Sequence, residues 1–209
     1  MAHPAFNREL EARAIEDYFD TNFELETRLK TQGKNRALAT VQNILPSHVR
    51  CTYVRQANPL GLGDAVLAAR HVVGDQPFAV LLADDIIDCG QKGCLQSMIE
   101  IFARLQSSVV AVEAILQEQS DKYGIISLAS KEGDVVRIDA VVEKPQPADA
   151  PSNLAVTGRY ILTARIFDLL ERTARGVGDE VQLTDRKKLR VIERLKQLSD
   201  RSQKPQGPP

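Results

Sequence analysis

A glycine-rich segment near the middle of the chain has the residue types that bind a phosphorylated ligand. It reads R-Q-A-N-P-L-G-L-G-D-A and contains Gln56, Gly61 and Gly63. Glycine lets a backbone approach a ligand closely, because no Cβ intervenes. A helix that starts directly afterwards offers free N–H groups to a phosphate or to a base edge. The Gln56 amide carries both a donor and an acceptor, as reading a pyrimidine edge requires. A plain turn is the alternative for the two glycines alone.

Two adjacent carboxylates follow an apolar run. Phe78 to Ala83 is short enough for a strand buried on both faces, and Asp84 and Asp85 come directly after it. Mg²⁺ prefers one or two carboxylates together with phosphate oxygens, so Asp84 is a candidate metal ligand. An aspartate that caps a helix or turn is an equally good interpretation of this pattern alone.

Further candidates lie in the second half of the chain. The segment V-V-E-K-P places Glu143 and Lys144 at a strand end, where Glu143 could accept hydrogen bonds from sugar hydroxyls and Lys144 could hold a phosphate. An exposed ion pair is the alternative. Gly124 and Gly158 are positions where a ligand could approach backbone closely. The acidic segment G-V-G-D-E-V-Q-L-T-D, from 176 to 185, is either a loop or a helix cap.

The elements that must position these residues alternate between strand and helix in the first half. The residue pattern predicts a strand at Val49–Arg55, a helix at Asp64–Val73, a strand at Phe78–Ala83 and a helix at Gln91–Leu105. In open α/β sheets, ligands bind beyond the carboxyl ends of the strands. The glycine segment and the aspartate pair are therefore expected to open onto the same edge.

The remaining elements complete an α/β fold. We expect helices over residues 8–30 and from Asn35, as N-cap, to Leu45, then strands at 108–116, 123–129, 135–143 and 154–163 and a helix at 164–173. The expected architecture is a Rossmann-like sheet, mixed and mostly parallel, with helices on both faces. One domain over 1–185 would precede a Lys- and Arg-rich tail over 186–209, whose composition is typical of a poorly ordered segment.

Composition excludes several classes. The 209 residues carry a formal net charge of -1, so no global charge favours nucleic acid. No apolar run approaches the roughly 20 residues of a membrane span. The N-terminus lacks the apolar core of a signal peptide, and the three cysteines have no metal-ligand spacing. We therefore expect a cytoplasmic protein with reduced thiols. No Ser-His-Asp or Cys-His arrangement supports nucleophilic catalysis.

Seven segments together resemble the bacterial UTP–glucose-1-phosphate uridylyltransferase family. They are R-A-I-E-D-Y-F-D-T-N-F-E-L-E (13–26), R-Q-x4-G-L-G-x-A (55–65), L-L-A-D-D (81–85), Y-G-I (123–125), V-V-E-K-P (141–145), P-S-N-L-A-V-x-G-R-Y-I-L (151–162) and G-D-E-V-Q-L-T-D (178–185). Their order and approximate spacing also fit this family. Several motifs together are far more specific than any one of them.

The resemblance implies transfer of UMP from UTP to glucose 1-phosphate, giving UDP-glucose and pyrophosphate, with Mg²⁺ as cofactor. It also implies a role for each matching residue. Gln56 and Gly61 would hold uracil, Asp84 would hold Mg²⁺, Gly124 and Glu143 would contact glucose, Lys144 would bind its phosphate, and Gly158 would lie beside the sugar. Asp179 and Glu180 are further substrate-binding candidates.

The sequence departs from the family pattern in three places. It lacks the family's G-x-G-T-R loop and P-K-E segment, it has G-L-G-D-A where the family has G-L-G-H-A, and after Asp185 it continues with the basic tail. We therefore expect a chain truncated at both ends, with impaired activity alone. Alternatives are another sugar-1-phosphate nucleotidyltransferase, or a non-catalytic sugar-nucleotide-binding or regulatory subunit. Homo-oligomers, or assembly with an intact paralogue, are the expected partners.

Overall fold

The computed structural model describes residues 16–88, 92–132, 135–173 and 180–183. The chain divides into two compact units, Met1–Arg55 and Gln56–Pro209. Asp179, all of the basic tail and the first part of the 8–30 helix prediction lie outside the described residues. No helix among the described residues is long and apolar enough to cross a membrane.

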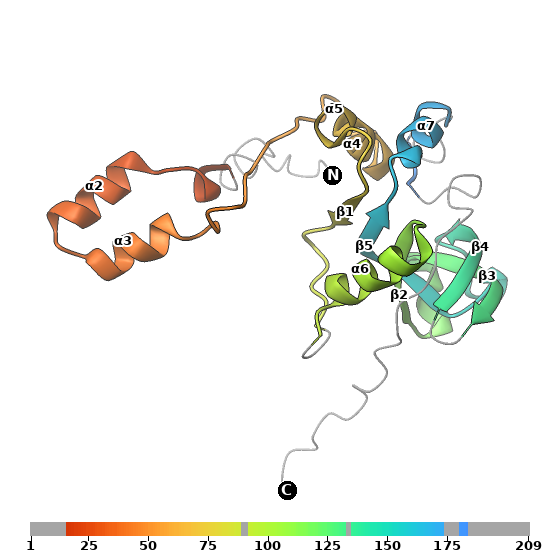
Figure 1. Ribbon diagram of the computed structural model, residues 1–209. Helices are drawn as coiled ribbons and strands as arrows, with labels where there is room; N and C mark the ends of the chain where they lie inside the picture. Colours follow the sequence, from red (N-terminus) through yellow and green to blue (C-terminus); the bar gives the residue numbers. More distant parts are fainter. Residues whose placement is uncertain (1–15, 89–91, 133–134, 174–179, 184–209) are drawn as a thin grey trace, which may run out of the picture. The chain divides into compact units, whose positions relative to one another are not determined.

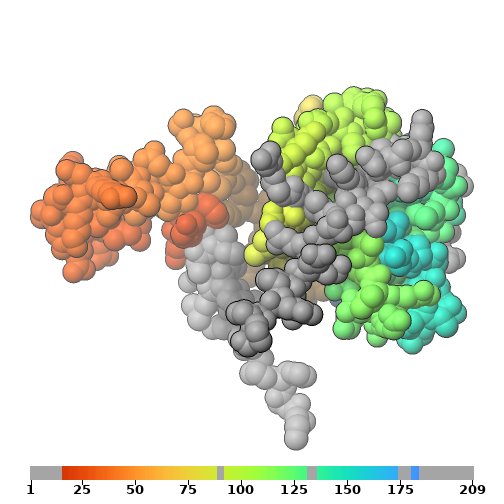
Figure 2. All heavy atoms as spheres, turned by 90° about the horizontal axis from the view of Figure 1, so that it is seen from below, coloured from red at the N-terminus to blue at the C-terminus, as the bar shows by residue number. Residues whose placement is uncertain are grey.

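The described part of the first unit contains helices α2 (Phe23–Thr31) and α3 (Asn35–Gln42) and has no buried residue. Helix α2 is capped by Asn22, whose side chain accepts a hydrogen bond from the Leu25 N–H at 3.0 Å. Helix α3 is capped at Lys34, so the prediction that Asn35 is the N-cap is wrong by one residue. Neither helix buries a residue, and the red and orange atoms of this unit form a narrow body in Figure 2.

The predicted strand at Val49–Arg55 is absent from the described structure. These residues are the last of the first unit and have no regular secondary structure. Val49 and Tyr53 are exposed. A β-rich composition produces a strand only where a neighbouring strand supplies ladder partners, and no described strand pairs with this segment.

The second unit is built on a five-stranded sheet (Figure 1). Its strands are β1 (Phe78–Leu81), β2 (Val109–Ala114), β3 (Gly124–Glu132), β4 (Val135–Glu143) and β5 (Leu154–Leu162). The path runs β1-β5-β3-β4, and β2 pairs with β5. Since Val80 and Val110 both pair with Tyr160, β1 and β2 lie on opposite edges of β5. The last of the described strands in sequence, β5, therefore lies at the centre of the sheet.

The described strand pairings are all antiparallel. The prediction of a mostly parallel sheet is therefore wrong for these strands. Strands β1 and β2 do run in the same direction, but β5 lies between them and runs the opposite way. A short apolar run specifies that a strand is buried, and it leaves the direction of its neighbour open. The broader α/β prediction holds.

Helices pack on both faces of the sheet. Side chains alternate between the faces of a strand, so Ile161 packs with Met98 of α6 (Cys94–Leu105) whereas Tyr160 and Leu162 face the other cluster. The second cluster includes Val66 of α4 (Leu62–Ala68) together with Ile166, Phe167 and Leu170 of α7 (Arg165–Glu171). The prediction of helices on both faces is confirmed.

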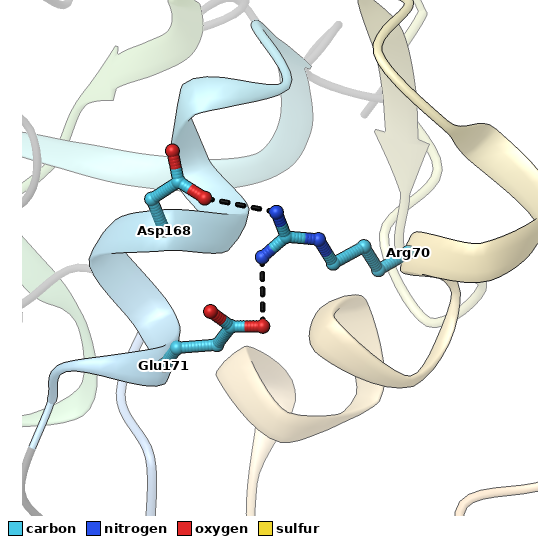
Figure 3. A network of polar contacts seen from close by, with 3 residues as sticks. All are labelled: Arg70, Asp168 and Glu171. Carbon is cyan, nitrogen blue, oxygen red and sulfur yellow. Dashed lines mark hydrogen bonds and ion pairs between the residues drawn. The ribbon is translucent and has the colours of Figure 1, made fainter.

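Apolar packing on the sheet, more than the ion pairs to α5 (Arg70–Val73), holds α7 in place. Arg70 forms ion pairs with Asp168 at 2.9 Å and Glu171 at 2.7 Å (Figure 3). All three side chains are at least 41% exposed, and such pairs contribute about 0–1 kcal/mol. Phe167 is buried and stacks on Phe78 with ring centroids 5.1 Å apart. Full burial of one such side chain contributes about 1.5–3 kcal/mol, so packing dominates.

Candidate functional site

A cavity opens where two strands stop along one edge of β5. Strand β1 follows β5 as far as the Leu82 N–H, which donates to the Gly158 carbonyl at 2.9 Å. Strand β3 begins to pair further along, with Ile125 opposite Ala155. The cavity at this break has a volume of about 220 Å³. It is lined by Leu62, Leu82, Asp85, Lys122, Tyr123, Gly124, Glu143, Val156, Thr157, Gly158, Tyr160, Gln182 and Leu183.

The acidic segment after β1 is fixed to β5 from both sides. The Asp85 carboxylate accepts a hydrogen bond from the Gly158 N–H at 2.6 Å. In return, the Arg159 guanidinium donates to the Leu82 carbonyl at 2.8 Å and also to the Asp85 carbonyl. Asp84 is exposed between these two held residues and does not line the cavity, whereas Asp85 does.

Gly158 is a glycine for steric reasons. A Cβ at this position would lie 2.5 Å from the Asp85 Oδ2 and 2.7 Å from the Leu82 Cβ. Contacts this short do not occur between real side chains, so any larger residue must displace the acidic segment. The absence of a side chain at Gly158 thus allows β1 and its aspartates to approach β5.

The sugar-side candidates share one corner of the cavity. Gly124 and Glu143 are register partners in the β3–β4 ladder, and a Cβ on Gly124 would meet the Glu143 carboxylate at 3.0 Å. The buried Ser120 hydroxyl donates to the Pro145 carbonyl at 3.1 Å. This bond ties the segment before β3 to the E-K-P turn.

Lys144 lies beside the cavity. Its N–H donates to the Tyr123 carbonyl at 2.9 Å, and its backbone has a φ of 47°. A positive φ is uncommon outside glycine, so the Tyr123 contact and the following proline hold Lys144 in a defined turn. The side chain is exposed and does not line the cavity.

The glycine segment and the second acidic segment meet at the opposite corner. The Val181 N–H donates to the Leu60 carbonyl at 2.7 Å, and the Gly63 N–H donates to the Val181 carbonyl at 2.8 Å. Gly61 has a φ of 90°, which favours glycine, and a Cβ added there would lie 3.0 Å from the Glu180 Cβ. These contacts bring Gln182 and Leu183 to the cavity wall.

Gln56 is held within the glycine segment. Its Nε2 donates to the Gly61 carbonyl at 3.2 Å and to the Asp64 carboxylate at 2.6 Å. Gln56 is half-buried and lies outside the cavity lining. The structure thus brings Gly124, Glu143 and Gly158 together around the cavity, whereas Gln56, Gly61 and Glu180 lie outside its lining, next to Leu62 and Gln182 in the sequence or in the same segment.

Tyr160 supplies a buried phenol to the cavity. Burial, followed by the nearby carboxylates of Glu143 and Asp85, raises the pKa of Tyr160 to about 12. All three causes disfavour the phenolate, which would bring a further negative charge into a partly dry, acidic environment. Tyr160 therefore stays protonated at neutral pH and offers a hydrogen-bond donor.

Mg²⁺ fits the donor set at the end of β1. Asp84 has an exposed carboxylate, and Asp85 presents another within the cavity. Within the described ranges, no group of three or more His, Cys, Asp or Glu side chains is arranged to hold a metal ion. A cation at this place would need oxygens from a bound ligand, which matches the preference of Mg²⁺ for few carboxylates plus phosphates.

The sequence reasoning missed Lys122, Arg159 and Tyr160, and it assigned the metal site to Asp84 alone. Tyr160 could have been found from strand periodicity, because it lies two residues after Gly158 and so faces the same side of β5. Lys122 directly precedes the Y-G-I motif. Arg159 gave no signal, since its role depends on the carbonyl groups of a segment far away in the sequence.

Comparisons with known proteins identify the family. A family model described as nucleotidyl transferase matches residues 13–201, and the chain belongs to this family. It is similar to the UTP–glucose-1-phosphate uridylyltransferase YngB of Bacillus subtilis, with 44% identity over 173 residues. That match covers 83% of this chain and 58% of the relative.

Solved structures give the same result. A UTP-bound UGPase from Acinetobacter baumannii matches with a TM-score of 0.79 and 41% identity, covering 88% of this chain and 66% of the other. A UDP-glucose pyrophosphorylase complexed with UDP-glucose matches with a TM-score of 0.74 and 40% identity, covering 88% and 68%. The resemblance drawn from the motifs is confirmed, and the chain spans a little over half the length of its curated relative.

Proposed function

We propose that this protein binds UDP-glucose and UTP, and that it acts in the transfer of UMP from UTP to glucose 1-phosphate. The observation that carries the proposal is the cavity at the break between β1 and β3. It places Asp85, Gly124, Glu143 and Gly158 around one space, beside the glycine segment. The relatives named UTP–glucose-1-phosphate uridylyltransferase support the choice of nucleotide and sugar.

The glucose end of the ligand would occupy the corner formed by Gly124 and Glu143. Glu143 accepts hydrogen bonds from sugar hydroxyls, and Gly124 and Gly158 leave room for the ring beside the backbone. Lys144 binds the sugar phosphate as a point charge from the E-K-P turn. An oxygen of the glucose 1-phosphate is then oriented to attack the α-phosphorus of UTP, in line with the bond to the departing pyrophosphate, and most of the rate gain comes from positioning.

The nucleotide end would lie along the glycine segment. Gln56 and Gly61 contact the base, and Glu180, which lies close to Gly61, is a further binding candidate. Asp179, the other candidate, lies outside the described residues. Asp84 would hold Mg²⁺, which supplies charge neutralisation on the phosphates. The free thiol of Cys51 supports a reducing, cytoplasmic setting for this chemistry.

Calorimetric titration of the purified 209-residue chain with UDP-glucose and Mg²⁺ tests the proposal. The native chain should release heat, and Asp84→Ala and Lys144→Ala should each weaken binding at least tenfold, because each removes a charge-assisted contact. Asp75→Ala is the matched control, since Asp75 is an exposed aspartate that precedes β1 and so lies at the opposite end of that strand from Asp84.

A turnover assay with UTP and glucose 1-phosphate then separates a transferase from a binding subunit. Release of pyrophosphate that depends on Lys144 supports the transferase. Binding without pyrophosphate release contradicts turnover by this chain and leaves sugar-nucleotide binding as its role. Absence of heat from a chain that melts cooperatively refutes the whole proposal.

A further inference from the structure

The contacts of the Gln56 amide fix which of its atoms is offered to a ligand. Both recorded partners of Nε2, the Gly61 carbonyl at 3.2 Å and the Asp64 carboxylate at 2.6 Å, are hydrogen-bond acceptors. A carboxylate and a carbonyl can receive only N–H groups, so the reverse orientation would place the Gln56 Oε1 against two oxygens. The amide orientation is therefore set by the chemistry of its neighbours.

This orientation leaves one kind of hydrogen bond for a ligand. A primary amide has two N–H donors and one carbonyl acceptor, and here the two donors have protein partners. Among the described residues, the Gln56 Oε1 receives no hydrogen bond, so Oε1 is the amide atom left for a ligand. Gln56 thus acts toward a ligand as an acceptor rather than as the donor-and-acceptor pair that its residue type suggests.

Asp64 is the stronger of the two partners. Its contact with Nε2 is charge-assisted and shorter than that of the Gly61 carbonyl. Asp64 is also the residue at which this sequence departs from the family pattern, with G-L-G-D-A in place of G-L-G-H-A. Without Asp64 only one longer bond to a neutral carbonyl would remain, and the amide could rotate to present an N–H.

We propose that Asp64 is a specificity-determining residue that makes the site select uracil over cytosine. Uracil has an N–H at ring position 3, whereas cytosine has an unprotonated acceptor nitrogen there. The Gln56 Oε1 accepts from the uracil N–H and faces the cytosine nitrogen as acceptor against acceptor. The inference rests on the proposed function, because it takes Gln56 as the residue that contacts the base.

The test compares binding of UDP-glucose with that of CDP-glucose, both with Mg²⁺, by calorimetry on the full chain. The native chain should favour UDP-glucose by on the order of tenfold to a hundredfold, because the half-buried Gln56 acceptor is left without a donor when cytosine is bound. Asp64→Ala should reduce this ratio by roughly tenfold. Asp64→Asn should keep most of it, because the asparagine carbonyl can still accept from Nε2. Asp75→Ala should leave the ratio unchanged.

Asp64→Lys provides a second and opposite perturbation. An ammonium offers only donors, so Gln56 should turn its carbonyl toward Lys and its N–H groups toward the base. The affinity for CDP-glucose should then rise relative to that for UDP-glucose. This variant provides the test if the Asp64→Ala protein does not melt cooperatively.

Each remaining outcome is decisive. A native chain that binds both sugar nucleotides equally refutes the inference while the proposed function stands. Discrimination that survives in both Asp64→Ala and Asp64→Lys also refutes it. A native chain that binds neither ligand overturns the proposed function and this inference together.

Discussion

Replacing Gly158 by alanine should loosen the end of β1 from the centre of the sheet. The added Cβ would lie 2.5 Å from the Asp85 Oδ2, 2.7 Å from the Leu82 Cβ and 3.0 Å from the Leu82 Cγ. The aspartate oxygen can rotate away, but the Leu82 Cβ moves only with its backbone. The Leu82 N–H bond to the Gly158 carbonyl must therefore lengthen or break.

The expected cost follows from these contacts. Overpacking by one methyl group costs about 1–3 kcal/mol. Loss of the Asp85 bond to the Gly158 N–H adds about 1.5–3 kcal/mol, because the acceptor is charged. The same shift relieves the overlap and breaks the bond, so the two costs overlap and the sum is about 2–4 kcal/mol. For a chain of this size, that corresponds to a melting temperature lower by roughly 5–15 °C.

Urea unfolding followed by circular dichroism measures this cost, with Gly93→Ala as the matched control. Gly93 has a φ of -56° and no atom within 4 Å of the added Cβ, so its replacement should cost only a few tenths of a kcal/mol. A Gly158→Ala protein as stable as Gly93→Ala would refute the close approach of β1 and β5 at this point. UDP-glucose binding should fall in parallel, because Asp85 lines the cavity.

Two further predictions concern the neighbours of Gly158 on β5. Arg159→Met should raise the Mg²⁺ concentration needed for half-maximal UDP-glucose binding by roughly tenfold, since it frees the Leu82 and Asp85 carbonyls that hold Asp84 in place. An unchanged Mg²⁺ requirement in a stably folded Arg159→Met protein would contradict this positioning role. Tyr160 should be the last tyrosine to ionise in an absorbance titration, near pH 12, and Tyr160→Phe should remove that component. Below pH 10 the phenol keeps its proton in both the folded and the unfolded chain, and its contribution to stability is fully present. As the pH rises from 10 to 12 the unfolded chain releases the proton first, so the free energy of unfolding falls by about 2–3 kcal/mol. Complete ionisation of the folded protein by pH 11 would count against the buried position of Tyr160.

Local periodicity was enough to predict most elements of the second unit. Strands β3, β4 and β5 fall within two or three residues of their expected ranges, because each alternates apolar and polar side chains between turn residues. Helix α6 was found from its apolar stripe, although Ile99 of that stripe is 53% exposed. The arrangement was not predictable in the same way, since β5 enters the sheet between two strands that precede it in the sequence.

For the candidate site, too, the sequence predicted the local motifs but not the long-range contacts. Motifs identified Gly124, Glu143 and Gly158, and the structure gathers them around one cavity. Glycine spacing could not show that Gly158 matters through its contact with Leu82 and Asp85. Likewise, the choice between Asp84 and Asp85 as cavity residue depends on which carboxylate meets a backbone N–H of β5. Long-range hydrogen bonds of this kind leave no periodic trace in a sequence.

The two backbone hydrogen bonds that join Val181 to Leu60 and Gly63 determine when the site forms during folding. The backbone partner of residues 60 and 63 lies more than a hundred positions later in the chain. Contacts of such high sequence separation carry a large loop-closure entropy and form late. During synthesis, the sheet edge and the sugar corner can assemble while residue 181 is still inside the ribosome. The base-side wall closes afterwards, so a nascent chain cannot hold a complete nucleotide pocket until nearly all of the described residues have emerged.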